Sequence, residues 1–147
     1  NTKNFKPALA TEKWFALDIK GIPFRGYIDK VDISSTGGLI ILDYKSGKKA
    51  ISKNDVEVNL QLSMYQLGAR GIWLLPVEKL SLYHLRSNTT VEVDARDDST
   101  LREAEKIVVT VSRAIQSKEF EPKLNSSCPC DYSVSCPLFN PSANPNY

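Results

Sequence analysis

Residues 39–45 read Leu-Ile-Ile-Leu-Asp-Tyr-Lys: four apolar side chains followed by an acid, an aromatic ring and a base. A short segment that is apolar at every position is typical of a strand covered on both faces. We therefore expect residues 38–45 to form a central strand of a sheet. Asp43 directly follows the apolar run, where an unpaired carboxylate would cost several kcal/mol, so a group near this position must offset its charge.

Strand and helix patterns alternate on both sides of this segment. Runs rich in β-branched and aromatic residues predict further strands over residues 14–19, 23–33, 80–85 and 89–93. Apolar residues at helical spacing predict a helix over 55–70, with Asn54 as its N-cap and Gly71 just after its end. Ser99 opens a second predicted helix that runs to about residue 117. The pattern indicates an α/β chain with a sheet and flanking helices.

The length of 147 residues fits one domain, with a core over residues 1–120 and an irregular tail rich in Pro and Cys over residues 121–147. Apolar content of 41% and charged content of 24% are ordinary for a globular protein, and no run approaches the roughly 18 apolar residues of a membrane helix. The chain begins with Asn1 and shows no signal-peptide pattern. We expect a cytoplasmic fragment or processed product with no membrane partner.

Positive charge gathers in the first third of the chain. Residues 1–53 hold 10 Lys and Arg against 5 Asp and Glu, whereas residues 54–147 hold 9 against 12. A basic excess attracts a phosphate backbone, but Lys-rich loops are about as often solvated surface. The charge distribution therefore leaves a nucleic-acid partner open.

A hairpin that turns about Thr36 would bring two carboxylates together. Positions summing to 72 then face one another, so Asp29 lies across from Asp43. Because side chains alternate along a strand, Lys45 shares the face of Asp43, whereas Asp32 and Tyr44 point to the other face. A bulge of one residue would reverse this assignment for one strand.

Two facing carboxylates destabilise a sheet unless a cation lies between them. Mg²⁺ is usually held by one or two carboxylates, waters and a substrate phosphate, so Asp29 and Asp43 are sufficient protein ligands. Lys45 beside them could act on the attacking water or neutralise charge on the phosphate. A structural Asp–Lys ion pair at a strand end is the alternative.

Three segments together resemble the RecB-type branch of the PD-(D/E)XK nuclease superfamily. They are residues 26–32 (Gly-Tyr-Ile-Asp-Lys-Val-Asp), 40–47 (Ile-Ile-Leu-Asp-Tyr-Lys-Ser-Gly) and 61–65 (Gln-Leu-Ser-Met-Tyr). Their order and spacing are similar to the family's over residues 12–65, and more weakly as far as Cys136. The resemblance implies a restriction-endonuclease-like core built on a central mixed β-sheet.

The resemblance also implies roles for individual residues. Asp29 and Asp43 would bind Mg²⁺ or Mn²⁺ together with the backbone carbonyl of Tyr44, and Lys45 would be the catalytic lysine. The family's helix after the hairpin carries a Gln and a Tyr at positions that Gln61 and Tyr65 occupy here. These two residues lie one helical turn apart, on one face of the helix, bordering the site. Asp32 matches a position that is usually structural in this family.

The chain departs from the family pattern before the first strand. Family members carry a further His or Glu on an upstream helix, and only 28 residues precede Asp29, so we expect this helix to be missing. Glu12 is the nearest upstream acid, and an ordinary surface carboxylate is the favoured interpretation over a metal ligand. His84, the single histidine, lies in an alternating strand and is expected to be structural.

Three cysteines, Cys128, Cys130 and Cys136, lie close together in the tail. An odd number without a secretory signal argues against a disulfide framework. Relatives such as AddB-type helicase-nuclease subunits pair three similar cysteines with an upstream fourth to hold a [4Fe–4S] cluster, which usually needs four thiolates. We expect the cluster only in the full-length protein; zinc held by three Cys and free thiols are the alternatives.

Taken together, the sequence predicts a metal-dependent deoxyribonuclease, expected to be an exonuclease of DNA repair and recombination. Its partners would be DNA and a helicase subunit or domain. The alternative is a catalytically inactive DNA-binding module of a helicase-nuclease complex. A Cys-rich interaction domain with an incidental Asp-x-Lys is a more remote third interpretation.

Overall fold

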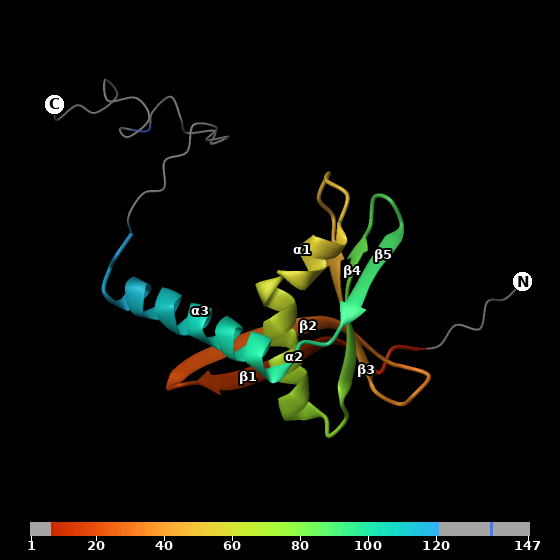
Figure 1. Cartoon of the computed structure of the whole chain (residues 1–147), viewed down its shortest axis with the longest axis horizontal. Coiled ribbons are helices and arrows are strands. Elements are labelled where there is room, and N and C mark those ends of the chain that lie inside the picture. The colour runs from red at the N-terminus through yellow and green to blue at the C-terminus, as the bar shows by residue number, and fades with distance from the viewer. Residues whose placement is uncertain (1–6, 121–135, 137–147) are drawn as a thin grey trace, which may run out of the picture. The chain divides into compact units, whose positions relative to one another are not determined.

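The computed structural model describes residues 7–120 and Cys136 of the chain (Figure 1). It contains five strands, β1 (Ala10–Ile19), β2 (Ile22–Ile33), β3 (Leu39–Lys45), β4 (Val77–His84) and β5 (Thr89–Asp94). The helices are α1 (Lys53–Glu57), α2 (Leu60–Ile72) and α3 (Asp98–Gln116). By its contacts the chain divides into two units, residues 1–113 and 114–147, and the architecture below is that of the first.

The strands form one mixed sheet in the order β1-β2-β3-β4-β5. Pairing is antiparallel except between β3 and β4, which run parallel and are joined through α1 and α2. Such a crossover needs a long connection, which the two helices provide. The predicted α/β class, the mixed sheet and the central place of β3 are confirmed, but β3 is fully buried on one face only, since Ile40 and Leu42 on the other face are half-buried.

The core lies between the sheet and α2, which packs across β1 to β4. Phe15, Ile28 and Ile41 are each almost fully buried there. The Phe15 ring fits because two neighbours lack side chains: a Cβ would lie 2.9 Å from the ring at Gly26 and 2.5 Å from it at Gly68. These glycines let α2 approach the β1–β2 hairpin closely.

The predicted helix over 55–70 is wrong in its detail, because the chain forms two helices there. A capping box between Ser52 and Asp55 begins α1, so Ser52 rather than Asn54 is the N-cap. The side chain of Asn59 accepts the backbone N–H of Leu62 and caps α2. Gly71 lies inside α2 rather than after it. The Ser-x-x-Asp pattern at 52–55 was the signal for the earlier start.

The last helix, α3, begins at Asp98, one residue before the predicted start. The carboxylate of Asp97 accepts the backbone N–H of Thr100 at 2.8 Å, which makes Asp97 the N-cap. Ala104, Val108 and Val109 are buried in a second apolar cluster with Ile19 and Met64. Within the residues described, no helix is long and apolar enough to cross a membrane.

Candidate active site

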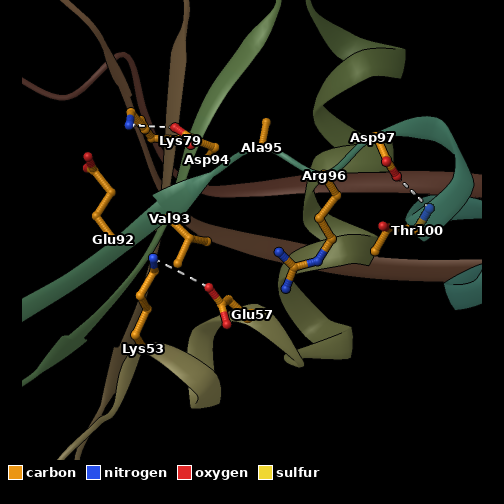
Figure 2. A pocket seen from close by; sticks show the side chains of 10 residues that line it. All are labelled: Lys53, Glu57, Lys79, Glu92, Val93, Asp94, Ala95, Arg96, Asp97 and Thr100. Carbon is orange, nitrogen blue, oxygen red and sulfur yellow. Dashed lines mark hydrogen bonds and ion pairs between the residues drawn. The ribbon is translucent and has the colours of Figure 1, made fainter.

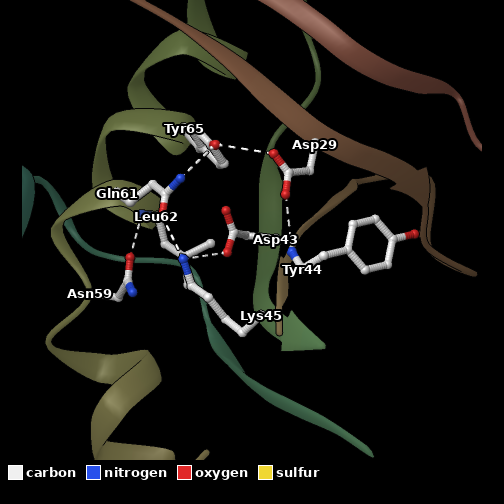
Figure 3. A network of polar contacts seen from close by, with 8 residues as sticks. All are labelled: Asp29, Asp43, Tyr44, Lys45, Asn59, Gln61, Leu62 and Tyr65. Carbon is white, nitrogen blue, oxygen red and sulfur yellow. Dashed lines mark hydrogen bonds and ion pairs between the residues drawn. The ribbon is translucent and has the colours of Figure 1, made fainter. Parts of the chain in front are cut away.

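Hydrogen bonds and one ion pair connect all five predicted catalytic residues in one network, the site cluster of Asp29, Asp43, Lys45, Gln61 and Tyr65 (Figure 3). Lys45 Nζ lies 2.7 Å from Asp43 Oδ2 and donates to Gln61 Oε1 at 2.7 Å. Gln61 Nε2 donates to the Tyr65 hydroxyl at 2.8 Å. Strand β3 thus supplies Asp43 and Lys45, and α2 supplies the side-chain amide of Gln61 that positions Lys45.

The second carboxylate, Asp29, completes the network from β2. The Tyr65 hydroxyl donates to Asp29 Oδ1 at 3.3 Å, and the backbone N–H of Tyr44 donates to Asp29 Oδ2 at 3.0 Å. Gln61 and Tyr65 act from one face of α2 because they are four residues apart. Residues from three elements therefore meet at one point.

The register of the β2–β3 hairpin agrees with the predicted turn about Thr36. Val31 pairs with Ile41, and the ladder continues to Lys30 opposite Leu42. Beyond this pair, the Asp29 carboxylate accepts a hydrogen bond from the backbone N–H of Tyr44. The interstrand bonding is thus continued by a side chain, and Asp29 and Asp43 lie as neighbours.

An irregularity in β1 lies directly opposite Asp29. The β1–β2 register pairs Thr11 with Lys30 and Lys13 with Ile28 but leaves out Glu12 and Asp29. Glu12 has a φ of 47°, in the left-handed region that is unusual for a side-chain-bearing residue. Its side chain is exposed, and it has no contact with the site cluster among the described hydrogen bonds and ion pairs.

Two side chains lie on the other face of the sheet, as strand parity predicts. Asp32 forms an ion pair with Lys30 at 2.7 Å. The Tyr44 ring packs edge-on against Tyr83, with the ring centroids 5.7 Å apart. Asp32 is therefore outside the site, and Tyr44 reaches it only through its backbone.

Burial gives the site its electrostatic character. Asp43 is 2% exposed, and this desolvation raises its pKa, against the opposing effect of Lys45 and with the help of the neighbouring Asp29 carboxylate. Burial likewise raises the pKa of Tyr65 to about 12, so its hydroxyl keeps its proton at neutral pH. Two carboxylates are thus held close together in a setting that disfavours negative charge.

The residues present fit a divalent cation. Asp43 Oδ2 is buried, and no hydrogen-bond donor reaches it with good geometry among the described residues, although Lys45 lies close enough to form an ion pair. A hard cation satisfies such an oxygen, and Mg²⁺ needs only one or two carboxylates from the protein. No group of three His, Cys, Asp or Glu side chains gathers within the described ranges, so the ligand set would be Asp29, Asp43 and a backbone carbonyl.

Residues at the turn between β4 and β5 contact the backbone carbonyls of residues 45–47. The backbone N–H of Leu85 donates to the carbonyl of Lys45 at 3.0 Å, and Arg86 Nε donates to that of Ser46 at 3.1 Å. His84, which is 3% exposed, lies 2.8 Å from the carbonyl of Gly47 through Nε2 and 2.6 Å from Ser87 Oγ through Nδ1. The structural role predicted for His84 is confirmed, since both ring nitrogens are in use.

A buried arginine that the sequence did not single out supports α2 from its other side (Figure 2). Arg96 Nε donates to Ser63 Oγ at 2.7 Å, and Nη2 donates to the carbonyls of Val56 and Asn59 at 2.7 and 3.1 Å. The side-chain amide of Gln66 bonds the backbone N–H and carbonyl of Arg96 at 2.9 and 2.8 Å. Arg96 thereby occupies the break between α1 and α2.

Most of the cysteines predicted to bind the iron–sulfur cluster lie outside the described residues. Cys128 and Cys130 lie outside the described residues, and Cys136 is described without them. The [4Fe–4S] cluster and its alternatives therefore stay predictions.

Comparisons with known proteins show the fold and the family. The chain matches the family described as the PD-(D/E)XK nuclease superfamily over residues 2–137. It is similar to the crystal structure of SSO0001, with 19% identity and a TM-score of 0.53, over 87% of this chain and 59% of that one. The search of curated proteins gave no match. Nucleases of this superfamily typically use a divalent metal, and the restriction-endonuclease-like fold is shared. The chain belongs to the PD-(D/E)XK nuclease superfamily.

Proposed function

We propose that this chain is the catalytic core of a deoxyribonuclease that depends on Mg²⁺ or Mn²⁺. The observation that carries the proposal is the site cluster, in which a buried oxygen of Asp43 has an ion pair with Lys45 as its one partner and lies beside a second carboxylate. A structural ion pair would not need Asp29 beside it. Membership of the nuclease superfamily supports the same conclusion.

Asp29, Asp43 and the backbone carbonyl of Tyr44 would hold the cation. When bound, it would polarise the phosphate and help a water molecule to attack. The buried position of Asp43 strengthens any charge interaction at this point. The reaction forms a bond from the water oxygen to phosphorus and breaks one ester bond to a sugar oxygen.

Lys45 is held in place before substrate arrives. Its Nζ lies between oxygens of Asp43 and Gln61, both at 2.7 Å, so the ammonium is fixed beside the place where phosphate charge would build up. A preorganised cation of this kind lowers the barrier without reorganising during the reaction. Gln61 and Tyr65 are positioning residues in this scheme, since they orient Lys45 and Asp29.

The test is cleavage of end-labelled single- and double-stranded DNA with Mg²⁺, with Mn²⁺ and with chelator. We expect cutting only with a divalent cation, and loss of cutting in Asp43→Ala and Lys45→Ala. Asp32→Ala is the matched control, because Asp32 is an acid of β2 that lies on the other face and pairs with Lys30. Metal-independent cutting, or cutting equal in all variants, would refute the proposal. Salt-dependent DNA binding without cutting would favour the inactive binding module.

The finer assignment follows from the sequence motifs. We propose a RecB-type, AddB-like enzyme that acts as an exonuclease with a helicase subunit or domain in DNA repair and recombination. The chain spans 59% of the length of the solved structure that it matches, so partners and substrates of the whole protein belong to the proposal. Measuring whether labelled nucleotides are released from ends or from within a circular single strand separates exonuclease from endonuclease action.

A further inference from the structure

An apolar hollow adjoins the site cluster. It has a volume of about 350 Å³ and is lined by Phe15, Phe24, Leu60, Met64 and Val108 together with Gln61 and Tyr65. Small-molecule sites commonly have volumes of about 300–1,000 Å³ and are mostly apolar with a few polar groups. The hollow therefore has the size and the lining of a site for one flat organic group.

Four aromatic residues line this hollow, Phe15, Phe24, Tyr27 and Tyr65, and Tyr27 is the most exposed of them at 56%. Phe15 stacks against Phe24, with centroids 6.2 Å apart and planes inclined by 30°, and meets Tyr65 edge-on at 6.0 Å. Tyr65 also belongs to the site cluster through its hydroxyl, as Gln61 does through its amide. The same two side chains thus line the apolar hollow and complete the polar network.

A second hollow of about 500 Å³ has a different character. Its lining includes the charged side chains of Lys45, Lys49 and Asp55 beside apolar residues, and Leu60 lines both hollows. Lys45 therefore lines a hollow that contains charged side chains and is connected through Gln61 to the aromatic hollow. A nucleotide shows the same division, because its phosphate is anionic and its base is flat and largely apolar on its faces.

We propose that the aromatic hollow binds one unpaired nucleobase of the strand being cut, next to the scissile phosphate. The inference rests on the proposed nuclease function and adds a subsite to it. A base stacks on aromatic side chains whatever its identity, so the subsite would be tolerant of sequence. A base must leave the helical stack to enter such a pocket. The enzyme would therefore require an unpaired nucleotide at one position beside the cut.

A scan with abasic nucleotides tests this directly. Single-stranded oligonucleotides carrying one abasic site at each position around the cut are compared by kcat/KM. Since stacking on a protein ring contributes roughly tenfold in affinity, we expect kcat/KM to fall roughly tenfold at one position only. An equal effect at all positions would overturn the subsite and leave the nuclease proposal standing.

A matched pair of variants on α3 connects the effect to the hollow. Val108→Trp fills the hollow, because Val108 is one of its lining residues, whereas Val111 on the same helix is 52% exposed and is absent from that lining. In Val108→Trp the abasic penalty should disappear, and in Val111→Trp it should remain. If Val108→Trp fails to fold, Leu60→Ala is used instead: it removes apolar surface from the hollow, so the abasic penalty should shrink, whereas it should remain in the exposed control Leu74→Ala.

A binding measurement decides the matter if DNA is not cut. An oligonucleotide with a single 2-aminopurine is titrated with the protein in Ca²⁺. A fluorescence change at one position that is lost in Val108→Trp supports the subsite, although the nuclease proposal would have failed. No change at any position, or a change that persists in Val108→Trp and in Leu60→Ala, overturns the subsite.

Discussion

Helix α2 carries two buried polar clusters, and they differ in how fully their charges are satisfied. On one side Gln61 and Tyr65 belong to the site cluster. On the other side Ser63 and Gln66 bond to Arg96, and we call these three residues the Arg96 cluster. Both clusters hold a charged group that is almost fully buried, at 2% exposure for Asp43 and 8% for Arg96.

The Arg96 cluster satisfies its charge with neutral acceptors. Four hydrogen bonds from the Arg96 backbone and side chain reach α2 or the end of α1, and desolvation lowers the pKa of the guanidinium. In the site cluster, by contrast, the buried Asp43 Oδ2 has only the Lys45 ammonium beside it, as an ion pair at 2.7 Å without good hydrogen-bond geometry, and a second acid lies nearby. The first arrangement stabilises the fold, whereas the second destabilises it, and under the proposed function a divalent cation would offset this cost.

The largest difference between the site cluster and the Arg96 cluster should appear in the variant Asp43→Asn. We expect this change to lower kcat/KM by at least roughly 10³-fold, about 4 kcal/mol of transition-state stabilisation. Without metal its free energy of unfolding should equal or exceed that of the wild type, because a buried carboxylate becomes neutral. Cleavage kinetics and urea unfolding in chelator measure the two effects. If Asp43→Asn unfolds more easily than the wild type, the buried carboxylate of Asp43 does not destabilise the fold.

Arg96→Met should show the reverse behaviour. Its loss removes three buried hydrogen bonds, those to Ser63 Oγ and to the carbonyls of Val56 and Asn59, so we expect destabilisation of about 3 kcal/mol in urea unfolding. The folded protein should keep kcat within a few-fold of the wild type. Arg102→Met, at an exposed position of α3, is the control. Unchanged stability would show that Arg96 is not the structural centre of its cluster.

Divalent metal should stabilise only through the site cluster. At a hundredfold excess over Kd, Mg²⁺ or Mn²⁺ should add about 2.7 kcal/mol to the free energy of unfolding of the wild type. Arg96→Met should respond equally, and Asp43→Asn should respond weakly. Thermal melting with metal and with chelator gives the comparison. An equal response in Asp43→Asn would place the metal elsewhere.

The smallest expected effect concerns the cap beside Arg96. Hydrogen bonds from Thr100 and Ser99 lower the pKa of Asp97 to about 2. Its stabilising contribution is thus present above the ordinary value of 3.8 and is lost as the pH falls through about 2. Asp97→Ala should melt below the wild type at pH 5 to 7, with the difference shrinking toward pH 2. A difference that is constant with pH would mean that the carboxylate charge does not contribute.

Local periodicity accounts for the parts of the site that the sequence predicts. The face shared by Asp43 and Lys45 follows from the two-residue repeat of a strand, and the approach of Asp29 follows from a short hairpin. Gln61 and Tyr65 share a face because they are one helical turn apart. These relations depend on neighbours close in sequence, whereas the choice of Gln61 and Tyr65 came from the resemblance to a family, so the sequence predicted the members of the site cluster but not the contacts that join α2 to the strands.

Long-range packing decided the rest. The break at Val58 and Asn59 coincides with carbonyls that Arg96 reaches from about 40 residues away. The aromatic hollow depends on how α2 and α3 sit against the β1–β2 hairpin, which the glycines at 26 and 68 permit. No local pattern encodes such contacts, because they depend on the distances and angles between elements. Only the tertiary structure therefore showed what supports the site and what adjoins it.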